Sequence, residues 1–266
     1  MIPFFKYQGA GNDFVMVDNR TTTYLTRKDT KAINWLCNRR FGIGGDGLIL
    51  LQNHPDYDFE MVYFNADGTE GSLCGNGGRC TVAFAKQLGI INHKCTFWAI
   101  DGEHEATINT EGNWVELKMA DLDTVHCNSD HYVLNTGSPH YIKYVDNVGQ
   151  LDVFTEGGNI RNNATYKKEG INVNFIEPLE NGFHIRTFER GVEDETLACG
   201  TGVTAAAISF ALEHPEKATT LLKNGGIPAK AEGGDLKVRF VQHGTSFEDI
   251  WLCGPATFVY NGKIKI

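Results

Sequence analysis

One short pattern occurs twice in the chain, and this repeat strongly limits how the chain can fold. Residues 70–77 read EGSLCGNG, and residues 195–202 read ETLACGTG, almost half of the chain later. Each copy follows a strand-rich segment and precedes a helical pattern. The repeat therefore predicts two related halves, with the connection between them near residues 116–130.

Strand-like runs are more frequent than helical patterns along the chain. Helices are expected near residues 27–40, 78–88, 148–155 and 202–213, with the last one ending before Pro215. Many strands with few helices favour an α+β fold over a doubly wound parallel sheet. The segment TAAAISFAL is apolar on nearly every face and should be surrounded by protein. A mainly antiparallel sheet curled around this helix would satisfy that requirement.

Composition narrows the functional classes. The chain has 266 residues, of which 41% are hydrophobic and 21% charged, as in ordinary globular proteins. A net charge of −9 argues against non-specific nucleic-acid binding. The N-terminal residues lack the pattern of a signal peptide, and no apolar run reaches the length of a membrane span. These features predict a cytoplasmic enzyme with no nucleic-acid or membrane partner.

The sequence contains no clear pattern for a metal-binding or a nucleotide-binding site. The seven cysteines are odd in number and form no CxxC pair, and the nine histidines form no close ligand pair. A literal GxGxxG pattern ends at Gly47, but a helical pattern precedes it and a strand follows. This order is the reverse of a dinucleotide-binding fingerprint. The sequence thus predicts a tight turn here, no metal and no organic cofactor.

Cys74 and Cys199 differ from the other cysteines in their setting. Each lies directly before a predicted helix, where unpaired backbone N–H groups and the helix dipole stabilise a thiolate. The same N–H groups can bind a substrate carboxylate, and the adjacent glycines allow a close approach. The remaining cysteines are interpreted as small buried side chains: Cys37, Cys80, Cys95, Cys127 and Cys253.

Two thiols of this kind suit the inversion of a stereocentre. A thiolate removes a proton from one face of a carbon, and a thiol donates a proton to the other face. Amide N–H groups on the substrate carboxylate would stabilise the charge that develops when the α-proton leaves. The pattern alone therefore predicts a thiol-pair racemase or epimerase.

The chain resembles the diaminopimelate epimerase family. The matching segments occur in order along the whole chain: GAGNDFV at 9–15, FGIGGDG at 41–47, FNADGTE and CGNGGRC within 64–80, GSPH at 137–140, INVNF at 171–175, FERGVEDETLACGTG at 188–202, and the late GPATFVY. The resemblance implies a cofactor-independent interconversion of LL- and meso-2,6-diaminopimelate in bacterial lysine and peptidoglycan-precursor synthesis. It also implies a homodimer.

The family implies a fold of two pseudo-symmetric domains, each a mainly antiparallel strand barrel around a central helix, with the site in the cleft between them. We expect an N-terminal half at 1–117, a C-terminal half at 118–254, and a last strand near 255–266 that returns to the first half.

The family also assigns roles to matching positions. Cys74 and Cys199 are implied to be the catalytic pair. The reacting carboxylate would be held at Gly75, Asn76, Gly200 and Thr201. The far amino-acid end of the substrate is assigned to five further positions: Asn12, Asn65, Asn172, Glu189 and Arg190.

Four further positions bear on the resemblance. His140 matches a family position beside the site, although a structural histidine in a proline-containing turn explains it equally well. Ser138 replaces an asparagine that is common in the family, so one substrate hydrogen bond is lost or comes from a hydroxyl. Many relatives carry a larger residue at Gly47 or Gly45.

A proline or hydroxyproline racemase, or a non-catalytic or single-base relative of the same fold, remains the alternative. The GNDFV start and the two retained cysteines argue against these.

Overall fold

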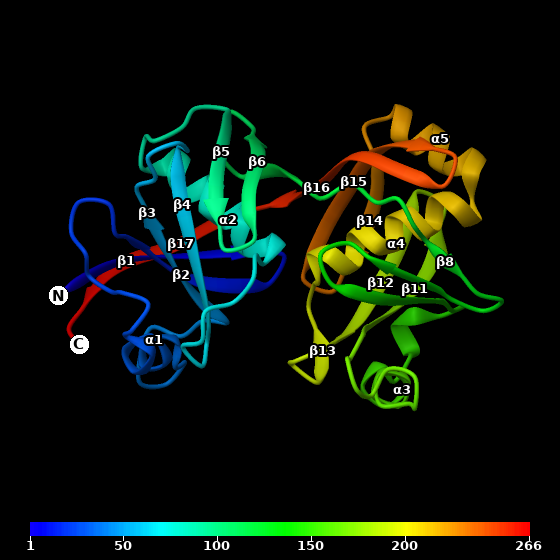
Figure 1. The fold of residues 1–266 in the computed structure, drawn as a ribbon, viewed down its shortest axis with the longest axis horizontal. Coiled ribbons are helices and arrows are strands. Elements are labelled where there is room, and N and C mark those ends of the chain that lie inside the picture. The colour runs from blue at the N-terminus through cyan, green and yellow to red at the C-terminus, as the bar shows by residue number, and fades with distance from the viewer. The chain divides into compact units, whose positions relative to one another are not determined.

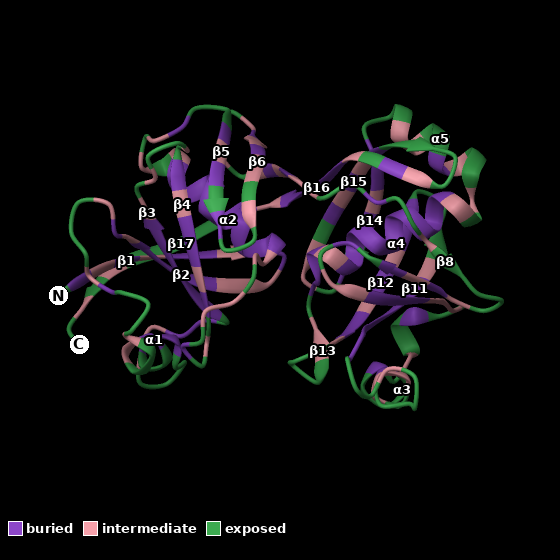
Figure 2. Ribbon diagram, in the orientation of Figure 1, coloured by how far each residue is buried: buried purple, intermediate pink, exposed green.

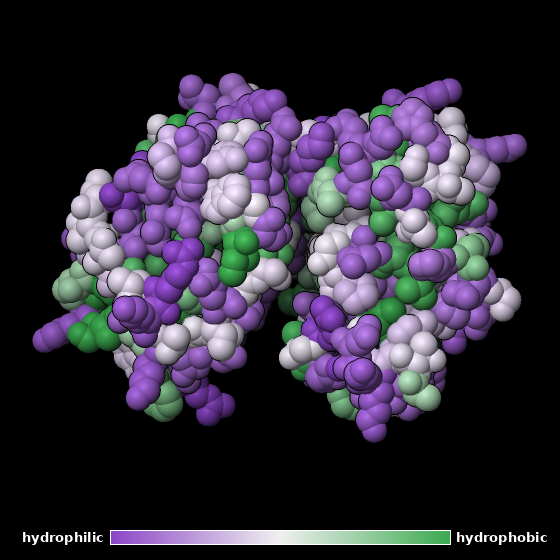
Figure 3. Space-filling model, viewed as in Figure 1, coloured by the Kyte–Doolittle hydropathy of each residue, from purple (hydrophilic) through white to green (hydrophobic).

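The computed structural model describes all 266 residues, which form two compact units. Unit 1 comprises Met1–Leu117 and Gly254–Ile266, and unit 2 comprises Lys118–Cys253. Figure 1 shows each unit as strands gathered around a helix. No helix is long and apolar enough to cross a membrane. The face drawn in Figure 3 is largely hydrophilic on each unit, with apolar side chains in small groups.

Unit 1 contains two helices and most of the N-terminal strands. Its elements run in this order: β1 (Ile2–Gly9), β2 (Asn12–Asp18), α1 (Thr30–Cys37), β3 (Gly47–Gln52), β4 (Phe59–Asn65), α2 (Gly75–Gln87), β5 (Lys94–Ala99), β6 (Gly102–Ile108), β7 (Trp114–Lys118) and, from the C-terminus, β17 (Thr257–Ile264). Strand β17 pairs with β1 in antiparallel register, Ile2 opposite Ile264.

Unit 2 follows the same plan with three additions. Its elements are β8 (His126–Cys127), β9 (Tyr132–Asn135), β10 (Pro139–Tyr144), the 3₁₀ turn η1 (Val148–Gln150), α3 (Val153–Arg161), β11 (Asn172–Leu179), β12 (Gly182–Glu189), β13 (Asp194–Thr196), α4 (Gly200–Glu213), α5 (Pro215–Lys223), β14 (Ile227–Ala231), β15 (Gly234–His243) and β16 (Ser246–Pro255). The additions are η1, β13 and α5.

Strand pairing shows that the two units share one topology. In unit 1 the pairs β1–β2, β3–β4, β5–β6 and β6–β7 are antiparallel, whereas β2–β3 and β4–β5 are parallel. In unit 2 the pairs β9–β10, β11–β12, β14–β15 and β15–β16 are antiparallel, whereas β10–β11 and β12–β14 are parallel. The order of pairings is the same, so the repeated cysteine motif belongs to a repeated fold.

The parallel pairs explain where the helices occur. Two parallel neighbours cannot be joined by a tight hairpin and need a crossover, which is usually helical. Helices α1 and α2 make the two crossovers of unit 1, and α3 and α4 make those of unit 2. The motif helices α2 and α4 are therefore required by the topology, and each begins where a crossover enters the inside of its unit.

The two motif helices form the centres of the units. Residues 75–85 of α2 are all buried, as are Gly200 and residues 202–211 of α4, and both helices are coloured as buried in Figure 2. A helix without an exposed face must be enclosed by protein. The predicted α+β fold, with strands wrapped around a central helix in barrel-like units, is confirmed.

The outer helices differ from the predictions in detail. The expected helix at 148–155 is a 3₁₀ turn followed by α3, which extends to Arg161. The helix expected to end before Pro215 does so, since α4 ends at Glu213, and a further helix that was not predicted, α5, begins at Pro215. Proline is compatible with the first position of a helix because the N–H it lacks has no acceptor there. Helix α3 packs on the sheet through Val153, with Tyr141, Val173 and Phe188 in the same apolar cluster.

Candidate active site

Cys74 is the N-cap residue of α2. Its backbone is extended (φ −90°, ψ 119°), and the following residue begins the helix. The first intrahelical bond runs from Gly78 N to the Cys74 carbonyl, at 2.7 Å. Backbone N–H groups in the first turn of a helix have no acceptor in a preceding turn, and they carry the positive end of the helix dipole. Cys74 thus lies where negative charge is stabilised, and its residue is only partly buried.

A series of hydrogen-bonded side chains links the Cys74 sulfur to the β1–β2 hairpin. Asn12 Oδ1 lies 3.3 Å from Cys74 Sγ, and Asn12 Nδ2 donates to Asp46 Oδ2 at 2.6 Å. The hairpin turn is formed by Ala10 and Gly11, whose φ angles of 51° and 83° lie in the left-handed region. Asp46 is fixed by Arg39, whose Nη2 lies 2.7 Å from Asp46 Oδ1. The turn and the ion pair together orient the Asn12 amide.

A buried arginine supports the first turn of α2 from within. Arg79 is fully buried and donates from Nη2 to Asn76 Oδ1 at 2.7 Å and from Nη1 to the Gly75 carbonyl at 3.3 Å. Its Nε also lies 3.5 Å from the Pro255 carbonyl. Asn76 Nδ2 in turn lies 3.4 Å from Asn12 Oδ1. Arg79 therefore fixes Asn76, a predicted site residue, beside the thiol.

Cys199 occupies the same position in unit 2. It is the N-cap residue of α4, with φ −110° and ψ 112°, and Val203 N donates to its carbonyl at 2.9 Å. Its sulfur lies 3.4 Å from Thr201 Oγ1. Thr201 is held from both ends, because its carbonyl accepts from Thr136 Oγ1 at 2.7 Å and its hydroxyl contacts His140 Nε2 at 2.8 Å. The structure thus joins three predicted residues, Cys199, Thr201 and His140.

His140 is fully buried on β10 and is kept neutral. Burial lowers the pKa of His140 to about 3, and the positive charge of Arg190 acts in the same direction. Its Nδ1 lies 3.0 Å from Asn174 Nδ2, which also donates to the Tyr141 carbonyl at 3.1 Å. Asn174 Oδ1 accepts from Thr187 Oγ1 at 3.0 Å. The ring is therefore fixed at both nitrogens.

Asn172 is hydrogen-bonded to two other predicted site residues, Ser138 and Arg190. Its Nδ2 donates to Ser138 Oγ at 2.8 Å and to the Pro139 carbonyl at 3.1 Å, and its Oδ1 accepts from Arg190 N at 2.9 Å. Arg190 Nη2 lies 3.4 Å from Ser138 Oγ. The Ser138 hydroxyl accepts from both groups, so its own proton can be donated elsewhere. Ser138, Asn172 and Arg190 form one polar group at the ends of β10, β11 and β12.

The other predicted residues also lie at the ends of strands or helices. Asn65 ends β4 and is exposed, and its Nδ2 lies 3.4 Å from Thr69 Oγ1. Glu189 ends β12 and is half-buried, opposite Asp194 of β13. Gly75 and Gly200 are buried first residues of their helices. Within unit 1 the structure brings Asn12, Cys74 and Asn76 into contact, whereas the Asn65 side chain contacts Thr69.

Gly47 has no space for a larger side chain in this protein. A Cβ atom there would lie 2.5 Å from the Phe64 carbonyl oxygen and 2.5 Å from the Tyr63 ring. At Gly45 a Cβ would meet its nearest atom, Lys6 Nζ, at 3.1 Å. Many relatives carry a larger residue at position 47 or 45, but in this protein only glycine fits at position 47 because β3 packs closely on β4.

The remaining cysteines separate into buried and exposed side chains. Cys37, Cys80, Cys95 and Cys253 are buried, and burial raises the pKa of Cys80 to about 12. Their interpretation as packing residues agrees with this placement. The interpretation is wrong for Cys127, which is exposed because the two-residue strand β8 has both residues on the surface.

Sequence reasoning missed Arg79, Asp46 and Asn174. Arg79 gave a signal, since a lone cation within the apolar stretch GGRCTVAFA must find internal partners when that helix is buried. Asn174 also gave one, because it lies two residues after Asn172 in a strand and so shares its face. Asp46 was hidden in a glycine-rich turn and gave no comparable signal.

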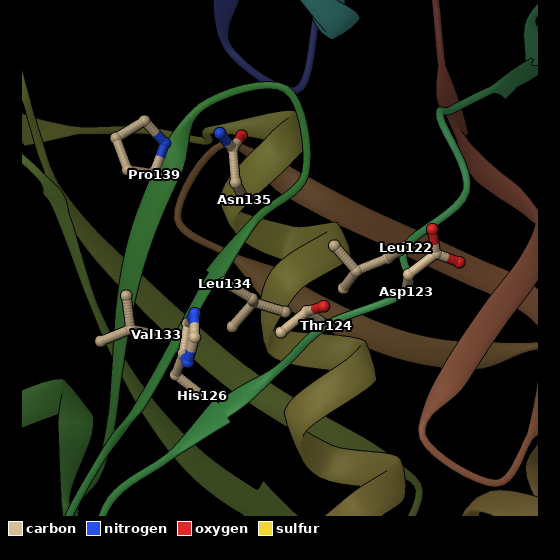
Figure 4. Close-up of a pocket in the computed structure, with 8 residues that line it drawn as sticks. All are labelled: Leu122, Asp123, Thr124, His126, Val133, Leu134, Asn135 and Pro139. Carbon is tan, nitrogen blue, oxygen red and sulfur yellow. The ribbon is translucent and has the colours of Figure 1, made fainter.

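A separate pocket in unit 2 contains little of this chemistry. Its lining is drawn in Figure 4: Leu122, Asp123, Thr124, His126, Val133, Leu134, Asn135 and Pro139. None of these is a predicted site residue. The two cysteine-bearing helix termini and their polar partners therefore define the candidate active site.

Comparison with known proteins finds similar sequences over nearly the whole chain. The sequence matches the family model of diaminopimelate epimerase over residues 4–125 and 132–259. It is 49% identical to the diaminopimelate epimerase of Flavobacterium psychrophilum over 261 residues, covering 98% of this chain and 99% of the relative. It is 46% identical to that of Chlorobaculum tepidum, covering 97% and 99%.

Solved structures show the same fold at low sequence identity. A phenazine biosynthesis protein of the PhzF family from Bacillus anthracis superposes with a TM-score of 0.74 at 15% identity, covering 100% of this chain and 99% of the other. A hydroxyproline epimerase from Agrobacterium vitis gives 0.63 at 14% identity, covering 99% and 90%. The family match and the near full-length relatives lead to one conclusion: this chain belongs to the diaminopimelate epimerase family.

Proposed function

We propose that this chain interconverts LL- and meso-2,6-diaminopimelate by moving an α-proton with Cys74 and Cys199, without an organic cofactor. One observation carries the proposal: the N-cap residue of the central helix is a cysteine in both units, and glycine follows it in both. Each unit would serve as one half of the enzyme and supply one thiol. Identity of up to 49% to relatives named diaminopimelate epimerase supports this substrate.

The chemistry divides between the two thiols. One cysteine, as thiolate, removes the α-proton, and the other, as thiol, protonates the opposite face of the same carbon. The electron pair left on carbon delocalises onto the substrate carboxylate. Helix-terminal N–H groups at Gly75, Asn76, Gly200 and Thr201 would bind that carboxylate and stabilise its increased charge.

The far end of the substrate carries a second ammonium and a second carboxylate. Arg190 and the Ser138 hydroxyl would bind the carboxylate, because a guanidinium and an O–H are both donors. Glu189 would bind the ammonium, with Asn12 and Asn65 as further amide partners. Asn172 would act mainly by holding Ser138 and Arg190 in place, since its amide already contacts both.

The cellular setting follows from the family. We propose that the enzyme works in the cytoplasm as a homodimer, and that its product supplies bacterial lysine and peptidoglycan-precursor synthesis. The charge of −9 supports the absence of a nucleic-acid partner.

The test is a direct assay of stereochemistry. Purified protein is incubated with LL-2,6-diaminopimelate without added cofactor, and the meso isomer is measured by chiral chromatography. Cys74→Ala and Cys199→Ala should each abolish conversion, whereas the control Cys127→Ala, at an exposed cysteine, should retain it. Conversion of proline or hydroxyproline in place of diaminopimelate would show that the chain is a different two-cysteine epimerase.

A further inference from the structure

The hydrogen-bond networks behind the two cysteines have opposite polarity. We infer that the resting enzyme carries its proton on Cys74 and its negative charge on Cys199. This assignment rests on the proposed function and extends it, because it states which thiol is ready to act as base and names the residues that set the difference.

The Asn12 amide presents an acceptor to Cys74. Asp46 is a carboxylate that can only accept, so Asn12 must direct its Nδ2 toward Asp46 Oδ2, at 2.6 Å. Asn12 Oδ1 then lies 3.3 Å from Cys74 Sγ. An S–H group can donate to this oxygen, whereas a thiolate would meet its lone pairs. The hydrogen bond therefore favours the protonated form of Cys74.

Formal charges near Cys74 oppose one another. The Asp46 carboxylate behind Asn12 disfavours a thiolate, but Arg39 Nη2 pairs with it at 2.7 Å, and the Arg79 guanidinium on α2 favours a thiolate. Cys80, also on α2, is buried and its pKa is raised to about 12, so it adds no charge. To these charges the Asn12 amide adds an acceptor at 3.3 Å from the sulfur, which favours the protonated thiol.

In unit 2, four groups linked by hydrogen bonds present a donor to Cys199. The Tyr141 carbonyl can only accept, so Asn174 directs its Nδ2 there and its second N–H to His140 Nδ1. A neutral imidazole that accepts at Nδ1 must carry its proton on Nε2. That proton is donated to Thr201 Oγ1, which leaves the threonine hydroxyl free to donate to Cys199 Sγ, 3.4 Å away.

The neutral state of His140 keeps this direction fixed. The ring is fully buried, and Arg190 is the charged group that acts on it, disfavouring imidazolium. Asn174 cannot reverse, because its amide oxygen would then face the Tyr141 carbonyl, which can only accept. Asn174 and His140 are therefore positioning residues that act through Thr201, and the O–H donor stabilises a thiolate at Cys199.

Proton movement in one turnover follows from this assignment. The Cys199 thiolate takes the α-proton and becomes a thiol, while the electron pair of the C–H bond passes to the carbon and its carboxylate. Cys74 gives its proton to the opposite face and becomes a thiolate. The resting form is therefore prepared for the diastereomer whose α-hydrogen faces Cys199.

Site-resolved alkylation tests the assignment without requiring turnover. The protein is treated briefly with iodoacetamide between pH 5 and 10, and modification of each cysteine is read by peptide mass spectrometry. The pH midpoint reports the thiolate fraction, whereas accessibility changes only the maximal rate. We expect the Cys199 midpoint to lie at least about one pH unit below that of Cys74, a tenfold difference in thiolate. A lower midpoint for Cys74 would overturn the inference, even in an active epimerase.

Variants test the relay and the amide separately. Thr201→Val should raise the Cys199 midpoint by about one pH unit, since a hydrogen bond to a charged group is lost, and Thr201→Ser should restore it. The control Thr204→Val removes another buried hydroxyl of α4, which donates to the Gly200 carbonyl, and should leave the midpoint unchanged. Asn12→Ala should lower the Cys74 midpoint.

Nitrogen-15 NMR of His140 checks the tautomer directly. We expect a proton on Nε2 and an unprotonated Nδ1 throughout pH 5–8. The reverse tautomer, or an unchanged Cys199 midpoint in Thr201→Val, would contradict the relay. Absence of epimerase activity with the predicted midpoints would instead count against the proposed function alone.

Discussion

Replacing Gly202 with alanine tests the packing that places His140 and Asn174 beside α4. A Cβ atom at Gly202 would lie 2.4 Å from Asn174 Oδ1 and 3.2 Å from His140 Cε1. The first distance is too short for any normal contact. Asn174 cannot move aside freely, because it is bonded to Tyr141, Thr187 and His140.

The size of the effect follows from these bonds. Displacing Asn174 breaks three buried hydrogen bonds, at about 1 kcal/mol each. Alanine recovers about 1 kcal/mol through its higher helix propensity. We therefore expect Gly202→Ala to lower the unfolding free energy of unit 2 by about 2 kcal/mol.

The matched control is Gly77→Ala, at the equivalent position of α2. A Cβ there would lie nearest to the ends of two flexible side chains, Ile49 Cδ1 at 3.1 Å and Met61 Cε at 3.4 Å, and at ordinary contact distance from Cys74 Cβ, 3.5 Å. This variant should change the unfolding free energy of unit 1 by less than about 1 kcal/mol. Urea unfolding combined with hydrogen-exchange mass spectrometry of α4, β11 and α2 reports each unit separately. Equal stability of the two variants would refute the packing argument.

Three further predictions concern protonation. The pKa of His140 is about 3 in the fold and about 6.5 when unfolded, so its neutral form stabilises the protein fully above pH 6.5 and progressively less below. Between pH 7 and pH 5 this effect should lower the free energy of unfolding, measured with urea, by about 2 kcal/mol. His140→Gln should lack this part of the decrease. The same pH dependence of stability in the wild type and in His140→Gln would contradict the prediction. Burial raises the pKa of Asp13, but hydrogen bonds from Arg39 and Lys6 outweigh this and hold it well below its usual range. The stabilisation by Asp13 is therefore fully present above about pH 4 and is lost gradually as pH falls toward the depressed pKa of the folded protein. Asp13→Asn should destabilise the protein at pH 7 and somewhat less at pH 3; a larger loss at pH 3 than at pH 7 would refute this. Cys80, whose pKa is raised to about 12 by burial, should stay unmodified by iodoacetamide at pH 8, and its alkylation in the folded protein would show that it is accessible.

The repeated motif allowed much of the fold and site to be predicted. Two copies of a Cys-Gly-x-Gly segment before helical patterns indicated two related halves, and the all-round apolar character of α4 indicated a helix enclosed by strands. The parallel pairs β2–β3 and β10–β11 were not predictable, because strand periodicity does not reveal which strands are neighbours. Helix α5 was missed because proline both ends and begins helices.

Individual side-chain contacts were harder to predict than residue roles. The family resemblance identified His140 and Asn172, but nothing in the sequence showed that Asn172 holds Ser138 and Arg190 or that Asn174 fixes the His140 ring. These contacts depend on the register of β10 with β11, which places His140 opposite Asn172. Register is set by long-range packing, so a single sequence does not supply it.

Deuterium exchange tests the two-thiol mechanism most directly. The protein is incubated with LL-2,6-diaminopimelate in deuterated water, and isotope content at the α-carbon is followed by mass spectrometry in both stereoisomers. At early times the meso product should contain solvent deuterium while the remaining LL substrate keeps its α-hydrogen, because separate thiols serve the two faces. Cys74→Ala and Cys199→Ala should form no meso product. No deuterium in the product of the wild type, or full conversion by either variant, would contradict the account.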